Sequence, residues 1–223
     1  KNMANIFKSS IGKKLIMSIS GLFLILFLLL HATINSLYII SKEGFITGCE
    51  IMGSPIIGIM VPILAAGFVI HIVYAFILTA QNLNARGGYK RYEVANKAAT
   101  DSWAARNMIV LGVIVLGVLA FHLTHFWADM QLKEWMGAHA EDPILLMETT
   151  FKSPIVVAIY LIWFAALWFH LTHGFWSAFH TIGMNNNVWM KRLKVLSYIF
   201  ATIIAGAFAA VAIVACLRAN GIM

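Results

Sequence analysis

Charged residues are scarce in this chain, and their scarcity excludes most soluble folds. Only 11% of the 223 residues are charged, whereas 61% are hydrophobic. Soluble domains usually contain about 25% charged and about 45–50% apolar residues. Cysteine is also scarce, since Cys49 and Cys216 are the only two and their spacing is not that of a metal site. A disulfide between them is one interpretation, but we favour two unpaired, small apolar residues.

The chain instead contains long apolar runs. A helix that crosses a bilayer needs about 20 mostly apolar residues, and five such runs are present, at residues 14–40, 56–83, 103–128, 154–182 and 193–217. The first run is too long for the core of a signal peptide and has no small-residue cleavage site after it. We therefore predict an all-α, integral membrane bundle of five transmembrane helices, which forms a single membrane domain over residues 1–223.

The net charge of +7 indicates membrane topology rather than nucleic-acid binding. If the N-terminus lies in the cytoplasm, the loops 84–102 and 183–192 lie there too, and 12 of the 16 Lys and Arg residues are on that side. Cytoplasmic loops are enriched in Lys and Arg in this way. The predicted C-terminus is then on the outer side.

Histidines occur inside the apolar runs, where ionisable side chains are rare and costly. The pattern FHLTH occurs twice, at 121–125 and 169–173, and each of the first four runs contains at least one of the eight histidines. A single buried histidine is as well explained by a neutral imidazole bonded to a neighbouring helix. Four helices that each contain one favour a functional site.

The depths of four histidines suggest two pairs. At 1.5 Å per residue, His31 and His122 lie roughly 10–14 Å from the outer ends of their runs. His71 and His170 each lie about 12 residues, or roughly 18 Å, from the inner ends. We therefore expect His31 to face His122, and His71 to face His170.

Two neutral imidazoles from facing helices can be the axial ligands of a haem iron, and helix bundles build such sites in their cores. Small residues that could make room for a flat porphyrin, or simply pack helices closely, flank two of the histidines: Gly67 and Ala75 beside His71, and Ala166 and Gly174 beside His170. Within each FHLTH the two histidines share a broad helix face. Periodicity does not decide which of them binds iron.

Several segments resemble the dihaem cytochrome b membrane anchor of succinate dehydrogenases and fumarate reductases, in its single-subunit, five-helix form. The matching segments are Ser10-Ile11-Gly12-Lys13-Lys14, Ser20-Gly21-Leu22, Phe27 with His31-Ala32-Thr33-Ile34-Asn35, Ala105-Arg106-Asn107-Met108, and Phe169-His170 with Gly174-Phe175-Trp176. The resemblance covers all five predicted helices.

The resemblance implies two b haems. His31 and His122 would hold the haem distal to the catalytic subunits, and His71 and His170 the proximal one. His125 and His173 would then support the ligands without binding iron. The proximal propionates would meet His180, Ser18 or Arg106.

A carboxylate near the first outer loop is implied for quinone chemistry, and Glu50 is the nearest candidate, followed by Glu43. An ordinary solvated loop acid is an equally good interpretation of either. Some fumarate-reducing members have a proton-conducting glutamate two residues before the fourth-helix ligand. Here that residue is Trp168, which cannot ionise.

The resemblance also implies partners. These are a flavoprotein subunit with covalent FAD and an iron–sulphur subunit, both on the cytoplasmic face of a bacterial inner membrane, together with a quinone such as menaquinone, in a possible dimer of heterotrimers. The chain has no dinucleotide fingerprint or cysteine cluster of its own. It would pass electrons between the iron–sulphur subunit and quinone in a respiratory chain, and would perform no dicarboxylate chemistry.

Three alternatives compete with this hypothesis. One is the haem b anchor of another respiratory enzyme, such as a hydrogenase or formate dehydrogenase. Another is a histidine-rich transporter or proton channel, although no acidic or basic residue other than histidine lies deep in a predicted span. The third is a membrane di-iron oxygenase, whose histidines usually lie at the aqueous boundary.

Overall fold

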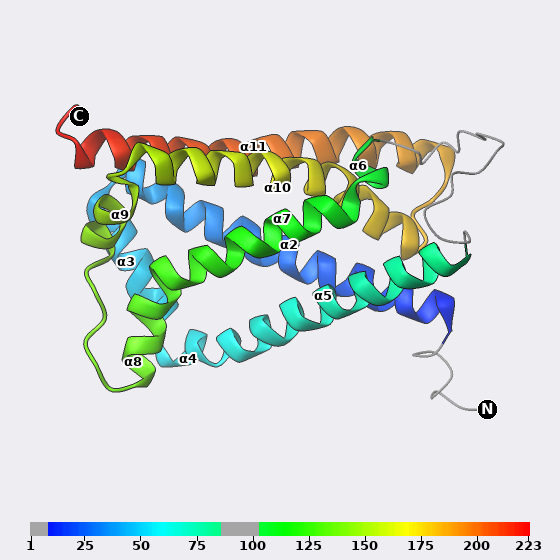
Figure 1. Cartoon of the computed structure of the whole chain (residues 1–223), viewed down its shortest axis with the longest axis horizontal. Coiled ribbons are helices and arrows are strands. Elements are labelled where there is room, and N and C mark those ends of the chain that lie inside the picture. The colour runs from blue at the N-terminus through cyan, green and yellow to red at the C-terminus, as the bar shows by residue number, and fades with distance from the viewer. Residues whose placement is uncertain (1–8, 86–102) are drawn as a thin grey trace.

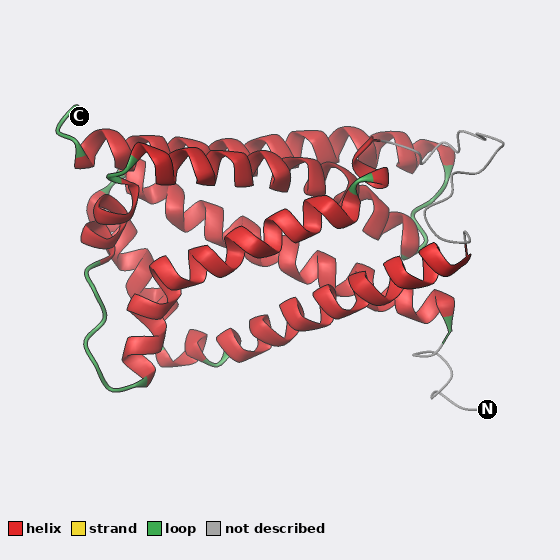
Figure 2. Ribbon diagram, viewed as in Figure 1, coloured by secondary structure: helices red, strands yellow, loops and turns green. Residues whose placement is uncertain are grey.

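The chain is a multi-pass membrane protein built from long apolar helices. The computed structural model describes residues 9–85 and 103–223, and none of these residues lies in a strand (Figures 1 and 2). In the described part, five helical segments are long and apolar enough to cross a bilayer: Ser10–Ile40, Pro55–Ala85, Met108–Trp135, Pro154–Thr181 and Asn187–Ala219. The predicted all-α fold with five spans is confirmed. Most of the predicted loop 84–102 lies outside the described residues.

The described residues form eleven helical elements. In chain order they are α2 (Ser10–Ile40), α3 (Lys42–Gly53), α4 (Pro55–Gly58), α5 (Met60–Ala85), α6 (Trp103–Arg106), α7 (Met108–His122), the π-helix η1 (Leu123–Leu132), α8 (Lys133–Trp135), α9 (Pro143–Phe151), α10 (Pro154–Thr181) and α11 (Asn187–Ala219). The start of α2 and the end of α11 lie at opposite ends of the bundle (Figure 1), as an odd number of spans requires. We call these the N-terminal end and the C-terminal end of the bundle.

Two helix starts differ from the prediction by five or six residues, and an asparagine explains each. The third span was expected to begin at Trp103, but Asn107 leaves the helical conformation, and its side chain donates a hydrogen bond to the Trp103 carbonyl. Asparagine competes with the helix backbone in this way. The fifth span begins at Asn187, before the predicted Leu193, because the Asn186 side chain accepts hydrogen bonds from the first amides of α11.

Four of the long helices form a ring. Backbone contacts are extensive between α2 and α5, between α2 and α10, and between α7 and α10, and they are slight between α5 and α7. Going round the ring, the order is therefore α2, α5, α7, α10. In this order α2 lies opposite α7, and α5 lies opposite α10. Helix α11 packs along α10 and α2 on the outside of the ring (Figure 1).

The outer surface of the bundle is apolar, as contact with lipid requires. Ile63 of α5, Ile162 of α10 and Ile203 of α11 have 48%, 66% and 62% of their surface exposed. Large apolar patches on soluble proteins are uncommon. Here the apolar patches lie on helices that are long enough to span a membrane, so lipid acyl chains can cover these patches.

The contact between α2 and α5 depends on a glycine. A Cβ atom added to Gly67 would lie 2.8 Å from two ring carbons of Phe23. The absence of a side chain at Gly67 therefore lets the Phe23 ring lie against the α5 backbone. Gly67 is one turn before His71, so this contact also fixes how close His71 lies to α2.

An arginine joins the last turns of α2 and α11 at the C-terminal end. Arg218 Nη1 donates to the Tyr38 carbonyl oxygen at 2.6 Å, and Nη2 donates to the Ile39 carbonyl at 3.3 Å. The last carbonyls of a helix have no partner within the helix. Arg218 supplies one, and its guanidinium also lies 4.9 Å from the centre of the Tyr38 ring.

Candidate functional site

The first predicted histidine pair is present as two facing rings. His31 lies in α2 and His122 is the last residue of α7, and their ring centres are 5.9 Å apart. Helices α2 and α7 are opposite each other in the ring, so the pair spans the interior of the bundle. Aromatic rings surround it: Phe27 stacks on His31 at 5.3 Å, Phe208 lies 5.6 Å from His31, and Trp163 lies 5.5 Å from His122.

The second predicted pair spans the other diagonal. His71 lies in α5 and His170 in α10, with ring centres 6.4 Å apart. A hydroxyl group contacts only one side of this pair: Ser20 Oγ lies 3.3 Å from His71 Nδ1. Nδ1 of His170 is buried without a hydrogen-bond partner, and the same is true of His122 Nδ1.

The two pairs lie at different levels along the bundle. His71 is level with Ser20 of α2, which it contacts, whereas the other pair includes His31 of the same helix. Eleven residues separate Ser20 from His31, which corresponds to about 16.5 Å along a helix. The two pairs therefore lie at different levels in the bundle, as the sequence predicted.

The separations of the rings, 5.9 and 6.4 Å, lie within the range of ordinary aromatic packing, about 4.5–7 Å, and are also close to what a metal between two imidazoles would require. A metal–imidazole bond is about 2 Å, and a ring nitrogen lies roughly 1 Å from its ring centre, so two axial imidazoles have centres about 6 Å apart. The observed 5.9 and 6.4 Å fit this arrangement. In the described residues no group of three or more His, Cys, Asp or Glu side chains is placed to hold a metal ion. A pair of axial ligands is a two-residue site.

The smaller residues beside the second pair have separate roles. Gly67 is required by the Phe23 ring rather than by free space beside His71. Gly174 lies in ordinary contact distance of Met108, at 3.6 Å from the Cβ position, and Ala166 is buried. Close helix packing, the alternative considered from the sequence, is therefore the observed role of Gly67.

The first FHLTH continues into a π-helix, which the sequence analysis did not predict. His122 ends α7, and η1 begins at the next residue. Single π-helical segments inside α-helices often occur at functional sites. Within η1, His125 Nδ1 lies 3.3 Å from the hydroxyl of Tyr160, whose ring centre is 6.2 Å from that of His122. His125 therefore contacts a tyrosine rather than another histidine.

The second histidine of the other FHLTH also lacks a facing histidine. His173 lies against the edge of Trp176, with ring centres 4.9 Å apart, and its Nδ1 atom is buried without a hydrogen-bond partner. Among the described residues, which include all eight histidines, the ring contacts between histidines join only His31 to His122 and His71 to His170.

The residues expected beside the proximal haem propionates differ in exposure. Ser18 is buried in α2, and His180 is exposed in the last turn of α10. Arg106 ends α6 near the N-terminal end of the bundle (Figure 1). Their contact with a haem group stays a prediction.

The two candidate quinone carboxylates lie in α3, a helix at the C-terminal end that the sequence analysis did not predict (Figure 1). Glu50 and Glu43 are both exposed. Glu43 interacts with its own backbone amide and accepts a hydrogen bond from the Ser41 hydroxyl at 3.1 Å, and these bonds hold its pKa below the usual value. Glu43 thus helps to cap α3, which leaves Glu50 as the acid without a capping role.

Cys49 and Cys216 are both free thiols, as the favoured interpretation of the sequence expected. Burial raises the pKa of the Cys49 thiol to about 11, and the nearby carboxylates of Asp142 and Glu50 act in the same direction. Neither cysteine contributes to the histidine pairs.

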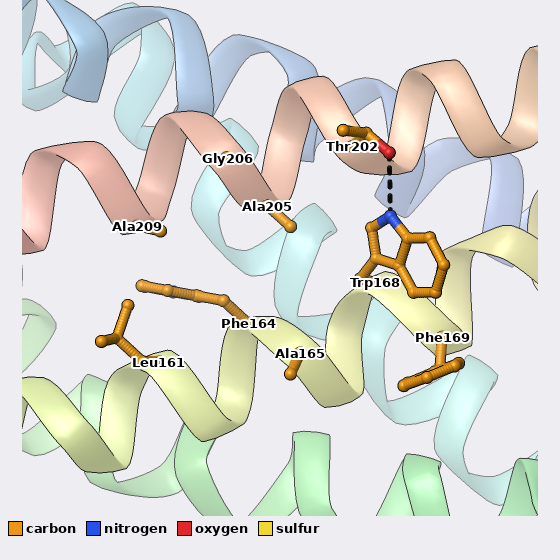
Figure 3. A pocket seen from close by; sticks show the side chains of 9 residues that line it. All are labelled: Leu161, Phe164, Ala165, Trp168, Phe169, Thr202, Ala205, Gly206 and Ala209. Atoms are coloured by element: carbon orange, nitrogen blue, oxygen red, sulfur yellow. Dashed lines mark hydrogen bonds between the residues drawn. The ribbon is translucent and has the colours of Figure 1, made fainter.

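Trp168 lies on a shallow groove between α10 and α11 (Figure 3). Its indole Nε1 donates a hydrogen bond to Thr202 Oγ1 at 2.9 Å. The groove has a volume of about 350 Å³ and is lined by Leu161, Phe164, Ala165, Trp168, Phe169, Thr202, Ala205, Gly206 and Ala209. Because the groove contains no ionisable side chain, it offers no proton-conducting group at the Trp168 position.

Ser20, Tyr160 and Trp163 are site residues that sequence reasoning missed. Each contacts one of the predicted ligands through a side chain with a polar atom. The available signal was the presence of a polar group in an apolar run. The hydroxyls of Ser20 and Tyr160 contact His71 and His125, whereas the Trp163 indole Nε1 is buried without a partner.

Comparison of the chain with family models, with curated proteins and with solved structures finds no match.

Proposed function

We propose that this protein is a membrane-bound cytochrome b that carries two haem groups. His31 and His122 would hold one haem, and His71 and His170 the other. The observation that carries the proposal is the pair of facing imidazoles on each diagonal of the helix ring, at 5.9 and 6.4 Å between ring centres. When bound, the two haems supply one-electron transfer along the bundle.

The chain itself would bind and shield the two groups. Its four proposed ligand histidines come from four different helices. The two histidines of each pair therefore reach the interior from helices on opposite sides of the ring. Phe27, Phe208 and Trp163 surround the first pair with apolar rings, which would exclude water from it. Burial and neighbouring hydrogen bonds are the means by which a protein adjusts the potential of such a group.

The resemblance of the sequence supports a more specific assignment. We propose that the protein is the anchor subunit of a succinate dehydrogenase or fumarate reductase, in a bacterial inner membrane with its N-terminus in the cytoplasm. A flavoprotein and an iron–sulphur subunit would dock at the N-terminal end of the bundle. Quinone, such as menaquinone, would react at the C-terminal end, where Glu50 offers an exposed carboxylate.

Haem content and partner identity test the proposal. The native complex should be purified from membranes, its haem quantified as the pyridine haemochrome, and its other subunits identified by mass spectrometry. We expect two b haems per chain, a flavoprotein and an iron–sulphur protein. One haem or none would contradict the dihaem proposal, and a hydrogenase or formate dehydrogenase subunit would contradict only the more specific assignment.

A further inference from the structure

The second histidine pair is asymmetric in its hydrogen bonds. His71 Nδ1 lies 3.3 Å from Ser20 Oγ, whereas His170 Nδ1 is buried with no partner. The two rings otherwise face each other from opposite helices. One imidazole of the pair is thus held by the protein at its Nδ1 atom, and the other is not.

The direction of the Ser20 bond follows from its other contact. Ser20 Oγ is 3.0 Å from the Met17 carbonyl oxygen of the preceding turn, to which the hydroxyl hydrogen is donated. A serine hydroxyl has one hydrogen to donate and two lone pairs that accept. Because the hydrogen is used on Met17, Ser20 Oγ must accept from His71. The Ser20 contact therefore places the hydrogen of the neutral ring on Nδ1.

The adjacent glycine makes room for the ring. A Cβ atom on Gly21 would lie 3.3 Å from His71 Cε1 and 3.6 Å from its Nδ1. The first of these distances is tighter than most real contacts, so a side chain at Gly21 would push the ring away from Ser20. Ser20 and Gly21 therefore form one surface of α2 on which the His71 ring rests.

We propose that Ser20 and Gly21 are positioning residues that fix His71 as the Nδ1–H tautomer and direct its Nε2 lone pair toward His170. This inference rests on the proposed function in so far as Nε2 is offered to a haem iron. A ligating histidine that donates its other N–H to a hydrogen-bond acceptor is a more basic ligand. A more basic ligand favours ferric over ferrous iron, so Ser20 would lower the midpoint potential of this haem and leave the other unchanged.

The potential is tested with matched variants in the full chain. Ser20→Ala should raise the midpoint of one haem only; if the hydroxyl contributes a tenfold preference for ferric iron, the shift is about 59 mV. Ser20→Thr retains the hydroxyl and should stay near the wild-type value. Ser36→Ala is the control, because Ser36 of the same helix donates to the Ala32 carbonyl in the same way. Equal midpoints in the Ser20→Ala and Ser36→Ala proteins would overturn the inference.

Gly21 has its own matched control. Gly21→Ala should move the same haem as Ser20→Ala, because the displaced ring loses its contact with Ser20. Gly206→Ala adds a methyl group with no heavy atom within 4 Å and should change neither haem. A Gly21→Ala protein with both potentials unchanged would show that the ring does not rest on this surface.

The tautomer provides a readout that does not require haem. The full chain with 15N-labelled histidine, reconstituted in liposomes and kept reduced, should show His71 protonated at Nδ1 by solid-state NMR, with the signal assigned by its loss in His71→Gln. In Ser20→Ala this signal should shift, and in Ser36→Ala it should not. Protonation at Nε2 in the wild type would refute the inference whatever the haem content, whereas an Nδ1–H signal in a protein without haem would contradict only the proposed function.

Discussion

Replacement of Gly67 by alanine should force α2 and α5 apart. The new Cβ would lie 2.8 Å from two carbons of the Phe23 ring, and relief to an ordinary contact of 3.4 Å requires a movement of about 0.6 Å. Overpacking of this kind typically costs about 1–3 kcal/mol. Since Gly67 is one turn from His71, the movement should also disturb the histidine pair behind it.

Gly206→Ala is the matched control for this prediction. Both glycines lie within long helices, and exchange of a helical glycine for alanine favours the folded state by about 0.5–1 kcal/mol. At Gly206 nothing lies within 4 Å of the new methyl group, so only this gain applies. The difference between the two variants therefore isolates the steric cost, which we expect to be about 1–3 kcal/mol, or roughly 5- to 150-fold in the unfolding equilibrium.

The assay is equilibrium unfolding of the reconstituted full chain in denaturing detergent. A double-mutant cycle with Phe23→Leu separates the contact from other effects, because the smaller side chain should remove most of the penalty at Gly67. If Gly67→Ala and Gly206→Ala were equally stable, or if Phe23→Leu gave no rescue, the close contact of α2 and α5 would be wrong.

Three further predictions concern other parts of the molecule. Arg218→Ala should destabilise the protein by about 1.5–3 kcal/mol, because two carbonyls lose a charged donor, and Arg218→Lys should recover only part of this. An unchanged unfolding midpoint would contradict a stabilising role for the Arg218 hydrogen bonds to α2. In a Cys216→Ser background, alkylation of Cys49 should keep accelerating with pH up to about 11, since burial raises its pKa from 9.0, whereas a plateau near pH 9 would show an ordinary thiol. His125→Gln and His173→Gln should each retain both haems, because neither ring faces another histidine; loss of a haem from either would reassign the ligand in that helix.

The number and order of the long helices could be predicted from the sequence because each span is a continuous apolar run. Their ends could be predicted less well. The break at Asn107 and the earlier start at Asn187 depend on side-chain hydrogen bonds to the backbone. The hydrophobicity of the sequence, from which the spans were predicted, does not indicate such hydrogen bonds. Helices α3 and α9 are short and mixed in polarity, so they carried no comparable signal.

The pairing of the histidines could be predicted because depth along a helix follows from residue number. The residues that surround the histidine pairs could not be predicted. The π-helix after His122 changes the direction in which His125 projects from the helix, and no local sequence pattern predicted this π-helix. The role of Gly67 depends on Phe23 in a different helix, and the contact of Ser20 with His71 joins residues 51 positions apart. Such contacts arise only when the helices pack.

The measurement that tests the account most directly is the haem spectrum of four single variants, in which His31, His71, His122 and His170 are each replaced by alanine in the full complex. Low-temperature difference spectra and haem quantification would show which haem each variant loses. We expect His31→Ala and His122→Ala to lose one spectral haem, and His71→Ala and His170→Ala to lose the other, since the rings of each pair face each other. If the His31 and His71 variants lost the same haem, or if all four variants retained both, the assignment of the two diagonal pairs as haem ligands would be wrong.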